Sequence, residues 1–382
     1  MSFEGKGVPR AAVAIAIFVM GLFAGGCGDY FRPVANPVLQ PGGDPLRTAH
    51  AVVISSNGAS PGTAVTIDVT GDTSVGTFAP SAECPACGLG RNPVHAASLL
   101  GVLHIYAANH DDDSVSSYTL LNVGSRPTIT TLLPGAQPVF VAPVGSKVFV
   151  AESGRASVAD IDSNSNAPTA EIPVGAAPVA LVAMPNGTKL YCINQADNTV
   201  SVIVPANDTI AKTIALSGTT PVWGTITSDG TQLFVVNQGS SNVSVIDTSS
   251  DEVVRTFPVG AGPNYAVFDP KLRRVYITSP ADKSITIFDT TNTATPNPLT
   301  ISLAGAPCNA AFPIGITALA DGTRAYVADR DTDTVCVLTT SNNVFTKSIS
   351  LEPATDSANN LIPRKPIAIG SDSDSRRVLT AN

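Results

Sequence analysis

Apolar and polar residues alternate with a period of two in short stretches along most of this chain. The stretch "QLFVVNQGSSNVSVIDTSSDEVVRTFPVG", residues 232–260, shows the pattern clearly. Its apolar positions are rich in Val and Ile, and turns of Gly, Asn, Asp and Ser separate the alternating stretches. Such alternation between turn residues predicts short β-strands. Together with the preceding "PVWGTIT", the stretch predicts a unit of four strands.

The same phrase recurs along the chain in three aligned columns. A proline column holds Pro93, Pro138, Pro178, Pro221, Pro263, Pro313 and Pro366. An aromatic column holds Tyr106, Phe149, Tyr191, Phe234, Tyr276 and Tyr326. Nine residues after each aromatic, a β-branched column holds Val115, Val158, Val200, Val243, Ile285 and Val335. The register is constant while the loops vary in length, which indicates structural repeats.

A four-stranded antiparallel unit repeated about seven times predicts an all-β, seven-bladed β-propeller. Six complete units occupy about residues 93–360. The chain end, "KPIAIGSDSDSRRVLTAN", continues the register for two strands, and residues 51–80 supply later strands. We expect the two ends to form one composite blade, because shared pairing hides the sheet edges. Both "AVVISSN" and "RRVLTAN" suit the second strand of that blade, and the choice between them stays open.

The repeated phrase resembles the YVTN-type repeat over about residues 51–382. The phrases "LFVVNQGSSNVSVIDTSSDEVVRTFPVG", "KLYCINQADNTVSVI", "RVYITSPADKSITIFD" and "RAYVADRDTDTVCVL" carry the resemblance. It implies a seven-bladed propeller. The repeat is also similar to that of seven-bladed lactonase-like proteins, which makes a sugar-lactone hydrolase the enzymatic alternative. No motif of this chain matches the catalytic residues of such enzymes, so none is carried over.

The N-terminus predicts export. Lys6 and Arg10 precede an apolar run over 11–26, which is shorter than the roughly 20 residues of a membrane span. The small residues before Cys27 resemble a bacterial lipobox. We therefore expect a lipoprotein signal peptide over 1–26, lipidation at Cys27, a flexible tether over 27–49 and the propeller over 50–382. Ordinary secretion and an uncleaved anchor are the alternatives.

This leader and the charge of the chain together predict where it acts. We expect the protein in the bacterial cell envelope, periplasmic or at the cell surface, touching the membrane only through its lipid anchor. The formal net charge is −8, and Lys and Arg together number only 22. Such a balance disfavours binding to nucleic acid.

A variable column lies two residues after each proline, near the start of the predicted innermost strand. It holds His95, Phe140, Ala180, Trp223, Tyr265, Gly315 and Ala368. Aromatic walls at a concave opening hold sugars and planar ligands. We therefore predict a ligand-binding site at the channel mouth, formed by His95, Phe140, Trp223 and Tyr265. The alternative is that these rings fill the junctions between wedge-shaped blades.

The remaining candidates for chemistry are acidic loops and cysteines. The loops "NHDDDS" and "DRDTDT" lack the ligand pattern of a calcium loop, so we predict solvated turns and no metal site. Export favours a disulfide, either between Cys84 and Cys87 or between one of them and Cys308. We expect Cys192 and Cys336, which fall in strands, to pack as small apolar residues.

No catalytic group is apparent in the sequence. The four histidines form no Ser/His/Asp arrangement, and neither a phosphate loop nor a dinucleotide motif occurs. We predict a non-catalytic binding or scaffold module without a cofactor, whose partner is a small molecule or protein at the channel-mouth face. A lactonase-like enzyme and a structural component of the surface are the alternatives.

Overall fold

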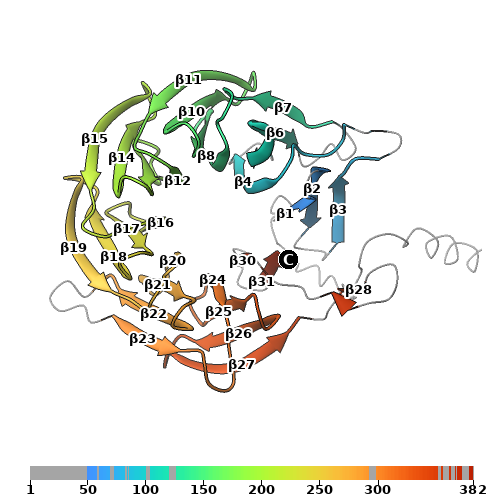
Figure 1. Ribbon diagram of the computed structural model, residues 1–382. Coiled ribbons are helices and arrows are strands. Elements are labelled where there is room, and N and C mark those ends of the chain that lie inside the picture. The colour runs from blue at the N-terminus through green and yellow to red at the C-terminus, as the bar shows by residue number, and fades with distance from the viewer. Residues whose placement is uncertain are drawn as a thin grey trace, which may run out of the picture.

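The computed structural model shows a ring of antiparallel sheets around a central opening (Figure 1). It describes residues 50–57, 60–68, 73–81, 84, 86–99, 104–119, 126–291, 298–351, 354–355, 361–362, 366, 368–371 and 378–381. The predicted leader, Cys27 and the tether lie outside these residues. Within them there is one short 3₁₀ helix, η1 (His110–Asp112), and no helix long and apolar enough to cross a membrane.

Six sheets contain four strands each, and within each sheet the strands follow one another in chain order. The first blade is β4 (Pro93–Leu99), β5 (His104–Asn109), β6 (Ser114–Thr119) and β7 (Thr128–Thr131). The second is β8 (Pro138–Val144), β9 (Lys147–Glu152), β10 (Ser157–Asp162) and β11 (Ala167–Pro173). The third is β12 (Pro178–Ala183), β13 (Leu190–Asn194), β14 (Thr199–Val204) and β15 (Thr209–Ala215).

The other three blades repeat this order. The fourth is β16 (Pro221–Ile226), β17 (Gln232–Asn237), β18 (Asn242–Asp247) and β19 (Glu252–Pro258). The fifth is β20 (Tyr265–Asp269), β21 (Arg274–Ser279), β22 (Ser284–Asp289) and β23 (Leu299–Ser302). The sixth is β24 (Pro313–Ala318), β25 (Arg324–Asp329), β26 (Thr334–Thr339) and β27 (Val344–Ser350). The first strand of each blade contacts the first strand of the next around the opening. The prediction of an all-β propeller is confirmed.

The described strands of the two chain ends pair differently from the expectation. The N-terminal sheet contains β1 (His50–Asn57), β2 (Ser60–Asp68) and β3 (Thr73–Phe78), and β1 lies beside β4. Near the C-terminus, β28 (Ala354–Thr355) pairs with β29 (Leu361–Ile362), and β30 (Ala368–Ser371) pairs with β31 (Val378–Ala381). Strand β30 lies beside β24. Each end thus supplies an innermost strand of its own, and the described residues of the two ends form three separate sheets instead of one composite blade. The count of seven blades stays a prediction.

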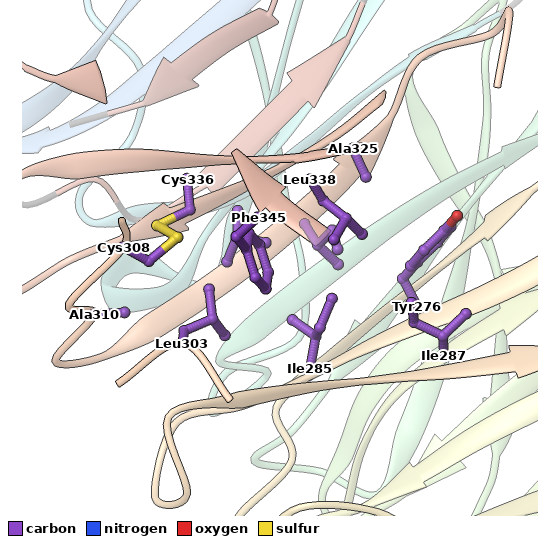
Figure 2. Packing of buried hydrophobic residues seen from close by; sticks show 12 residues of the cluster. Tyr276, Ile285, Ile287, Leu303, Cys308, Ala310, Ala325, Cys336, Leu338 and Phe345 are labelled. Carbon is purple, nitrogen blue, oxygen red and sulfur yellow. A yellow bond between two sulfur atoms is a disulfide. The ribbon is translucent and has the colours of Figure 1, made fainter. Parts of the chain in front are cut away.

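The core lies between neighbouring blades. Figure 2 shows one cluster, in which Tyr276 and Ile285 of the fifth blade face Leu338 and Phe345 of the sixth, with Leu303 from the loop that joins them. The aromatic column is fully buried in five blades, and Tyr326 is half-buried in the sixth. Burying such large rings between blades is the main apolar contribution to the packing of the ring.

The repeated phrase also carries a buried polar position at the end of each second strand. The residues there are Asn109, Glu152, Asn194, Asn237, Ser279 and Asp329, all fully buried. In the third blade, Asn194 Nδ2 donates to the hydroxyls of Thr199 and Ser201, both at 3.0 Å. Buried polar groups must find partners, and here the partners are the Ser and Thr residues of the third strand. The amide therefore ties the second strand to the third across their turn.

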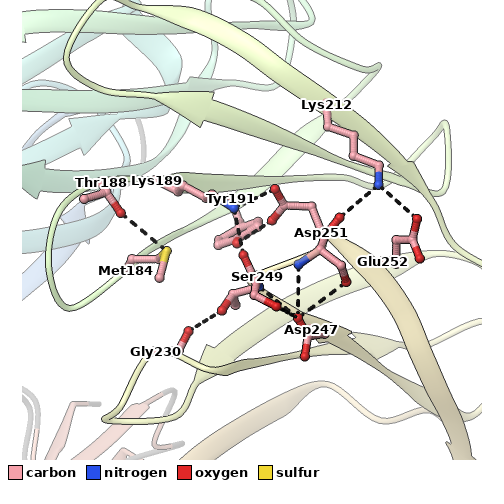
Figure 3. A network of polar contacts seen from close by, with 12 residues as sticks. Met184, Thr188, Lys189, Tyr191, Lys212, Gly230, Asp247, Ser249, Asp251 and Glu252 are labelled. Atoms are coloured by element: carbon pink, nitrogen blue, oxygen red, sulfur yellow. Dashed lines mark hydrogen bonds and ion pairs between the residues drawn. The ribbon is translucent and has the colours of Figure 1, made fainter.

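Polar contacts also join one blade to the next. In Figure 3, Lys189 Nζ lies 2.6 Å from Asp251 Oδ2, and the Tyr191 hydroxyl donates to Asp251 Oδ1 at 2.8 Å. Asp251 lies in the turn before β19, so β13 and the loop before it in the third blade hold a turn of the fourth. Burial, together with the carboxylate of Asp251, raises the pKa of the Tyr191 hydroxyl. Lys147 makes the same kind of contact with Asp208 of the following blade.

Candidate binding site at the channel mouth

The four residues predicted at the channel mouth lie in one continuous line of rings. His95 stacks on Phe140 with ring centroids 3.6 Å apart. Phe140 meets Trp223 edge-on at 5.6 Å, and Trp223 lies 4.7 Å from Tyr265. The rings come from β4, β8, β16 and β20, the innermost strands of four blades. We call these four residues the aromatic arc.

A bulge at the start of the innermost strand places the side chains of His95, Phe140 and Trp223, whereas β20 begins at Tyr265 without one. In β16, Pro221 pairs with Asn237 and Trp223 pairs with Val236, so Val222 is an extra residue in the ladder. The same irregularity occurs in β4, β8, β12 and β24. A β-bulge changes the direction of the side chains that follow it. In these five strands the residue two positions after the proline is the first to pair after the bulge, and the prolines of the column are all buried.

A small residue in the third blade allows the arc to be continuous. Ala180 is the member of the variable column in β12, and it is buried. Strand β12 lies between β8 and β16. Because an alanine side chain ends at Cβ, the ring of Phe140 reaches the ring of Trp223 across β12. A larger residue here would separate the two halves of the arc.

The arc packs between blades and is also partly open to solvent. Phe140 contacts the apolar clusters on both sides of the third blade. Trp223 Nε1 donates to the carbonyl oxygen of Ala266 in β20 at 3.0 Å. All four rings are nevertheless half-buried, whereas the residues of the aromatic column in the same blades are fully buried. Space filling therefore accounts for part of each ring and leaves part of it accessible.

Two polar atoms stand at the ends of the arc. His95 Nδ1 accepts a hydrogen bond from the backbone N–H of Val141 at 3.3 Å. Burial lowers the pKa of His95 to about 4, so the ring is neutral at pH 7 and its proton is on Nε2. At the other end, burial raises the pKa of the Tyr265 hydroxyl, which stays protonated. Within the described part of the chain, neither His95 Nε2 nor the Tyr265 hydroxyl has a hydrogen-bond partner.

The wall around the arc carries almost no charge. Across the innermost strands of the six four-stranded blades, Asp269 is the one residue with a formal charge at pH 7. It is fully buried at the end of β20, where its Oδ1 accepts the backbone N–H groups of Lys271 and Leu272. Tyr265 begins that strand and Asp269 ends it. The innermost strands therefore surround the arc with neutral groups.

The acidic loops on the mouth side hold backbone groups. Asp112 Oδ2 accepts the N–H of Arg91, and the two carboxylate oxygens of Asp113 accept the N–H groups of Gly135 and Gln137, all at 2.8 Å. In the sixth blade, Asp329 accepts the N–H of Phe312 at 2.8 Å. These turns thus fix the loops that lead from blade to blade. Among the described residues, no three His, Cys, Asp or Glu side chains gather as metal ligands would.

The cysteines differ from the expectation in one respect. Cys84 is joined to Cys87 by a disulfide, which is one of the two pairings that the sequence left open. Cys308 is joined to Cys336 (Figure 2). The expectation that Cys336 packs only as an apolar residue is therefore wrong, because the loop before β24 brings Cys308 over the third strand of the same blade. Cys192 is free and fully buried, and burial raises the pKa of its thiol.

Glu152 takes the place of the buried asparagine in the second blade and was not among the predicted site residues. Its Oε2 accepts a hydrogen bond from Ser157 Oγ at 2.5 Å, while Oε1 is buried without a partner. Burial, together with the neighbouring carboxyl of Glu171, raises the pKa of Glu152 to about 7. The signal was present in the sequence, because "FVAES" has Glu where "FVVNQ" has Asn.

Solved structures confirm the fold. The chain is similar to hydrazine synthase of Kuenenia stuttgartiensis, with a TM-score of 0.61, 18% identity, and coverage of 76% of this chain and 92% of that one. For virginiamycin B lyase from Staphylococcus aureus the values are 0.59, 17%, 76% and 91%. For a putative 6-phosphogluconolactonase from Bacteroides fragilis they are 0.60, 14%, 81% and 97%. At such identities the likeness shows the β-propeller fold alone. No protein-family model and no curated protein matches the sequence.

Proposed function

We propose that this protein is a non-catalytic, exported binding module whose ligand contacts the aromatic arc at the channel mouth. The observation that carries the proposal is the arc itself, in which four half-buried rings from four blades form one line. Accessible aromatic surface at a concave opening supplies large contact area for a small ligand. The neutral wall around it supports binding through ring faces rather than through charge.

The cellular setting is also a proposal, and it rests on the sequence of residues 1–49. Lipidation at Cys27 would hold the propeller at the cell envelope through the tether. Intact-mass analysis of membrane-extracted protein tests this. We expect a mature N-terminus at Cys27 with acyl chains, and we expect Cys27→Ser to give unprocessed or released protein. A different N-terminus, or one without acyl chains, contradicts the anchor.

The lactonase-like alternative has no specific observation in its favour. The likeness to a putative 6-phosphogluconolactonase is a likeness of fold at 14% identity. Assembly into a surface structure likewise has no feature of its own. The lactonase-like alternative enters the test below as an outcome.

The chain contains a single Trp, so its fluorescence reports directly on the arc. We expect acrylamide to quench the emission of Trp223, because the ring is half-buried. Sugars, lactones and peptides are then screened for a change in that emission. A ligand whose effect is lost in Phe140→Leu and kept in Phe312→Leu supports the proposal. Phe312 is the matched control because it is also half-buried on the mouth side, where it lies under Arg330 instead of in the arc.

Three results overturn the proposal. Blue-shifted emission that acrylamide does not quench would make Trp223 a packing residue. A ligand effect that survives Phe140→Leu would place binding elsewhere. Turnover of a lactone in the screen would establish the enzymatic alternative.

A further inference from the structure

The chemistry of the arc also defines the kind of ligand it fits, and this inference rests on the proposed function. The middle of the arc offers ring surface and no free polar atom. Phe140 has no polar group, and the indole N–H of Trp223 is already donated to the carbonyl of Ala266 at 3.0 Å. A ligand above these two rings therefore makes apolar contacts only, and a polar group buried there would lose its hydrogen bonds to water.

The ends of the arc are different. His95 Nδ1 is engaged by the N–H of Val141, which leaves Nε2–H as a hydrogen-bond donor. The Tyr265 hydroxyl, which both donates and accepts, has no partner among the described residues. The arc therefore has the order donor, apolar ring, apolar ring, hydroxyl. This order matches a ligand that is apolar in its middle and polar at both ends.

The lack of charge on the innermost strands further restricts the class of ligand. His95 is uncharged at pH 7, and Asp269, the one formally charged residue of the six innermost strands, is fully buried at the far end of β20 from Tyr265. A charged ligand would lose hydration on the arc without gaining a counter-charge from these strands, which disfavours it.

The variable column is asymmetric around the ring. Blades one, two, four and five contribute rings, while the sixth contributes Gly315, which is buried. A Cβ built on Gly315 would meet Ile369 Cγ2 at an ordinary 3.5 Å. Strand β24 lies beside β20 and adds no ring, so the aromatic surface ends at Tyr265. The rings are inclined to one another, by 64° between Phe140 and Trp223 and by 37° between Trp223 and Tyr265, so a ligand meets both ring faces and ring edges.

From these four features we infer that the ligand is an uncharged molecule that is apolar in its middle and has polar groups at both ends, one accepting a hydrogen bond from His95 and the other pairing with Tyr265. Neutral glycosides of fused-ring alcohols have this chemistry. The fused ring contacts Phe140 and Trp223, and the sugar hydroxyls or a ring carbonyl occupy the ends.

Two commercially available probes test this ligand class with the full chain at pH 7. The neutral probe is 4-methylumbelliferyl β-glucoside, and 4-methylumbelliferyl sulfate has the same flat ring with a negative charge. Equilibrium dialysis gives a Kd for each without relying on protein fluorescence. We expect the glucoside to bind and the sulfate to bind at least about tenfold more weakly, since a tenfold change corresponds to the loss of about one good polar interaction.

Isosteric variants then test the two ends. His95→Phe keeps a ring on Phe140 and removes the donor, and Tyr265→Phe removes only a hydroxyl. We expect each to weaken glucoside binding about five- to tenfold, in line with the loss of a single hydrogen bond. Tyr326→Phe is the matched control, because it removes a tyrosine hydroxyl from the sixth blade, outside the arc. Circular dichroism melts show whether the variants fold.

The outcomes separate this inference from the proposed function. Equal binding of the sulfate, no binding of the glucoside up to millimolar concentration, or unchanged affinity in both isosteric variants overturns the ligand class. In each of these cases the arc remains a binding site if acrylamide quenches Trp223 and a screened compound acts through Phe140. If Trp223 is not quenched, both the site and the ligand class fail.

Discussion

Asn237 and Trp223 are near neighbours in one blade and behave in opposite ways. Asn237 ends β17 opposite Pro221, and Trp223 pairs with the residue just before it. The position of Asn237 is fully buried in all six blades, whereas the position of Trp223 ranges from histidine to glycine and is half-buried wherever it holds a ring. One set of positions in the repeat therefore stabilises the propeller fold. Another set is free to vary and defines the channel wall. The following predictions test this division.

Removing a whole piece of the ring should have the largest effect. Deletion of residues 366–382 removes β30 and β31 and exposes β24, against which β30 lies. Ile369 packs with Ala328 and Val335, and each such side chain contributes roughly 1.5–3 kcal/mol when buried. Several of them approach the whole stability of a domain, about 5–15 kcal/mol. We expect aggregation or a far lower melting temperature in calorimetry. An unchanged melting temperature would show that the N-terminal sheet closes the ring unaided.

Breaking the polar position of a single blade should have the next largest effect. Asn237 Nδ2 donates to Asn242 Oδ1 at 2.8 Å and to Ser244 Oγ at 2.9 Å. Asn237→Leu leaves the buried Ser244 hydroxyl without this donor, and each unsatisfied buried group costs about 1–3 kcal/mol. We expect the free energy of unfolding in urea to fall by about 2–4 kcal/mol. Gln238→Ala changes the exposed next residue and serves as the control. An equal, small effect of both substitutions would contradict the structural role of the amide.

Glu152 is the exception among these buried positions, because its titration makes the stability of the protein depend on pH. Because burial raises its pKa to about 7, the folded state holds the proton up to a higher pH than the unfolded state, whose value is near 4.5. Its contribution to stability is full below pH 4.5 and is lost as the pH rises through 7. Glu152→Gln has no proton to lose.

We therefore expect the melting temperature of Glu152→Gln, relative to the parent protein, to rise between pH 5 and pH 8. Glu252→Gln is the control, because the carboxyl of Glu252 is 69% exposed beside Lys212. A difference that is constant across this pH range would refute the buried, protonated carboxyl.

The smallest effect on stability is expected at the arc. Trp223→Phe keeps an apolar ring and loses the hydrogen bond from the indole N–H to Ala266. A typical hydrogen bond contributes about 0.5–1.5 kcal/mol, so urea unfolding should shift by no more than about that amount. A loss as large as that of Asn237→Leu would assign Trp223 to the repeated framework and remove the division between the two positions.

The arc could be predicted as a set of residues but not as a line of contacts. His95, Phe140, Trp223 and Tyr265 follow from counting two residues past each proline. That Phe140 meets Trp223 across Ala180 depends on how far three blades are turned relative to one another, which alternation does not encode. The free Nε2–H of His95 likewise depends on the N–H of Val141, a residue of the next blade. The pairing of Cys308 with Cys336 was missed for the same reason, since a loop had to fold over a strand.

The sequence by itself determined the strands, their grouping into units of four and the propeller fold. Period-two alternation and a constant register are local properties that recur in every repeat. It also determined which positions are fixed and which vary. Only the tertiary structure decided where the two ends lie, since β1 and β30 each find an innermost place beside a complete blade. It also decided the neutral state of His95 and the raised pKa of Glu152. Both depend on desolvation by residues distant in the chain, and burial exists only once the blades pack into a ring.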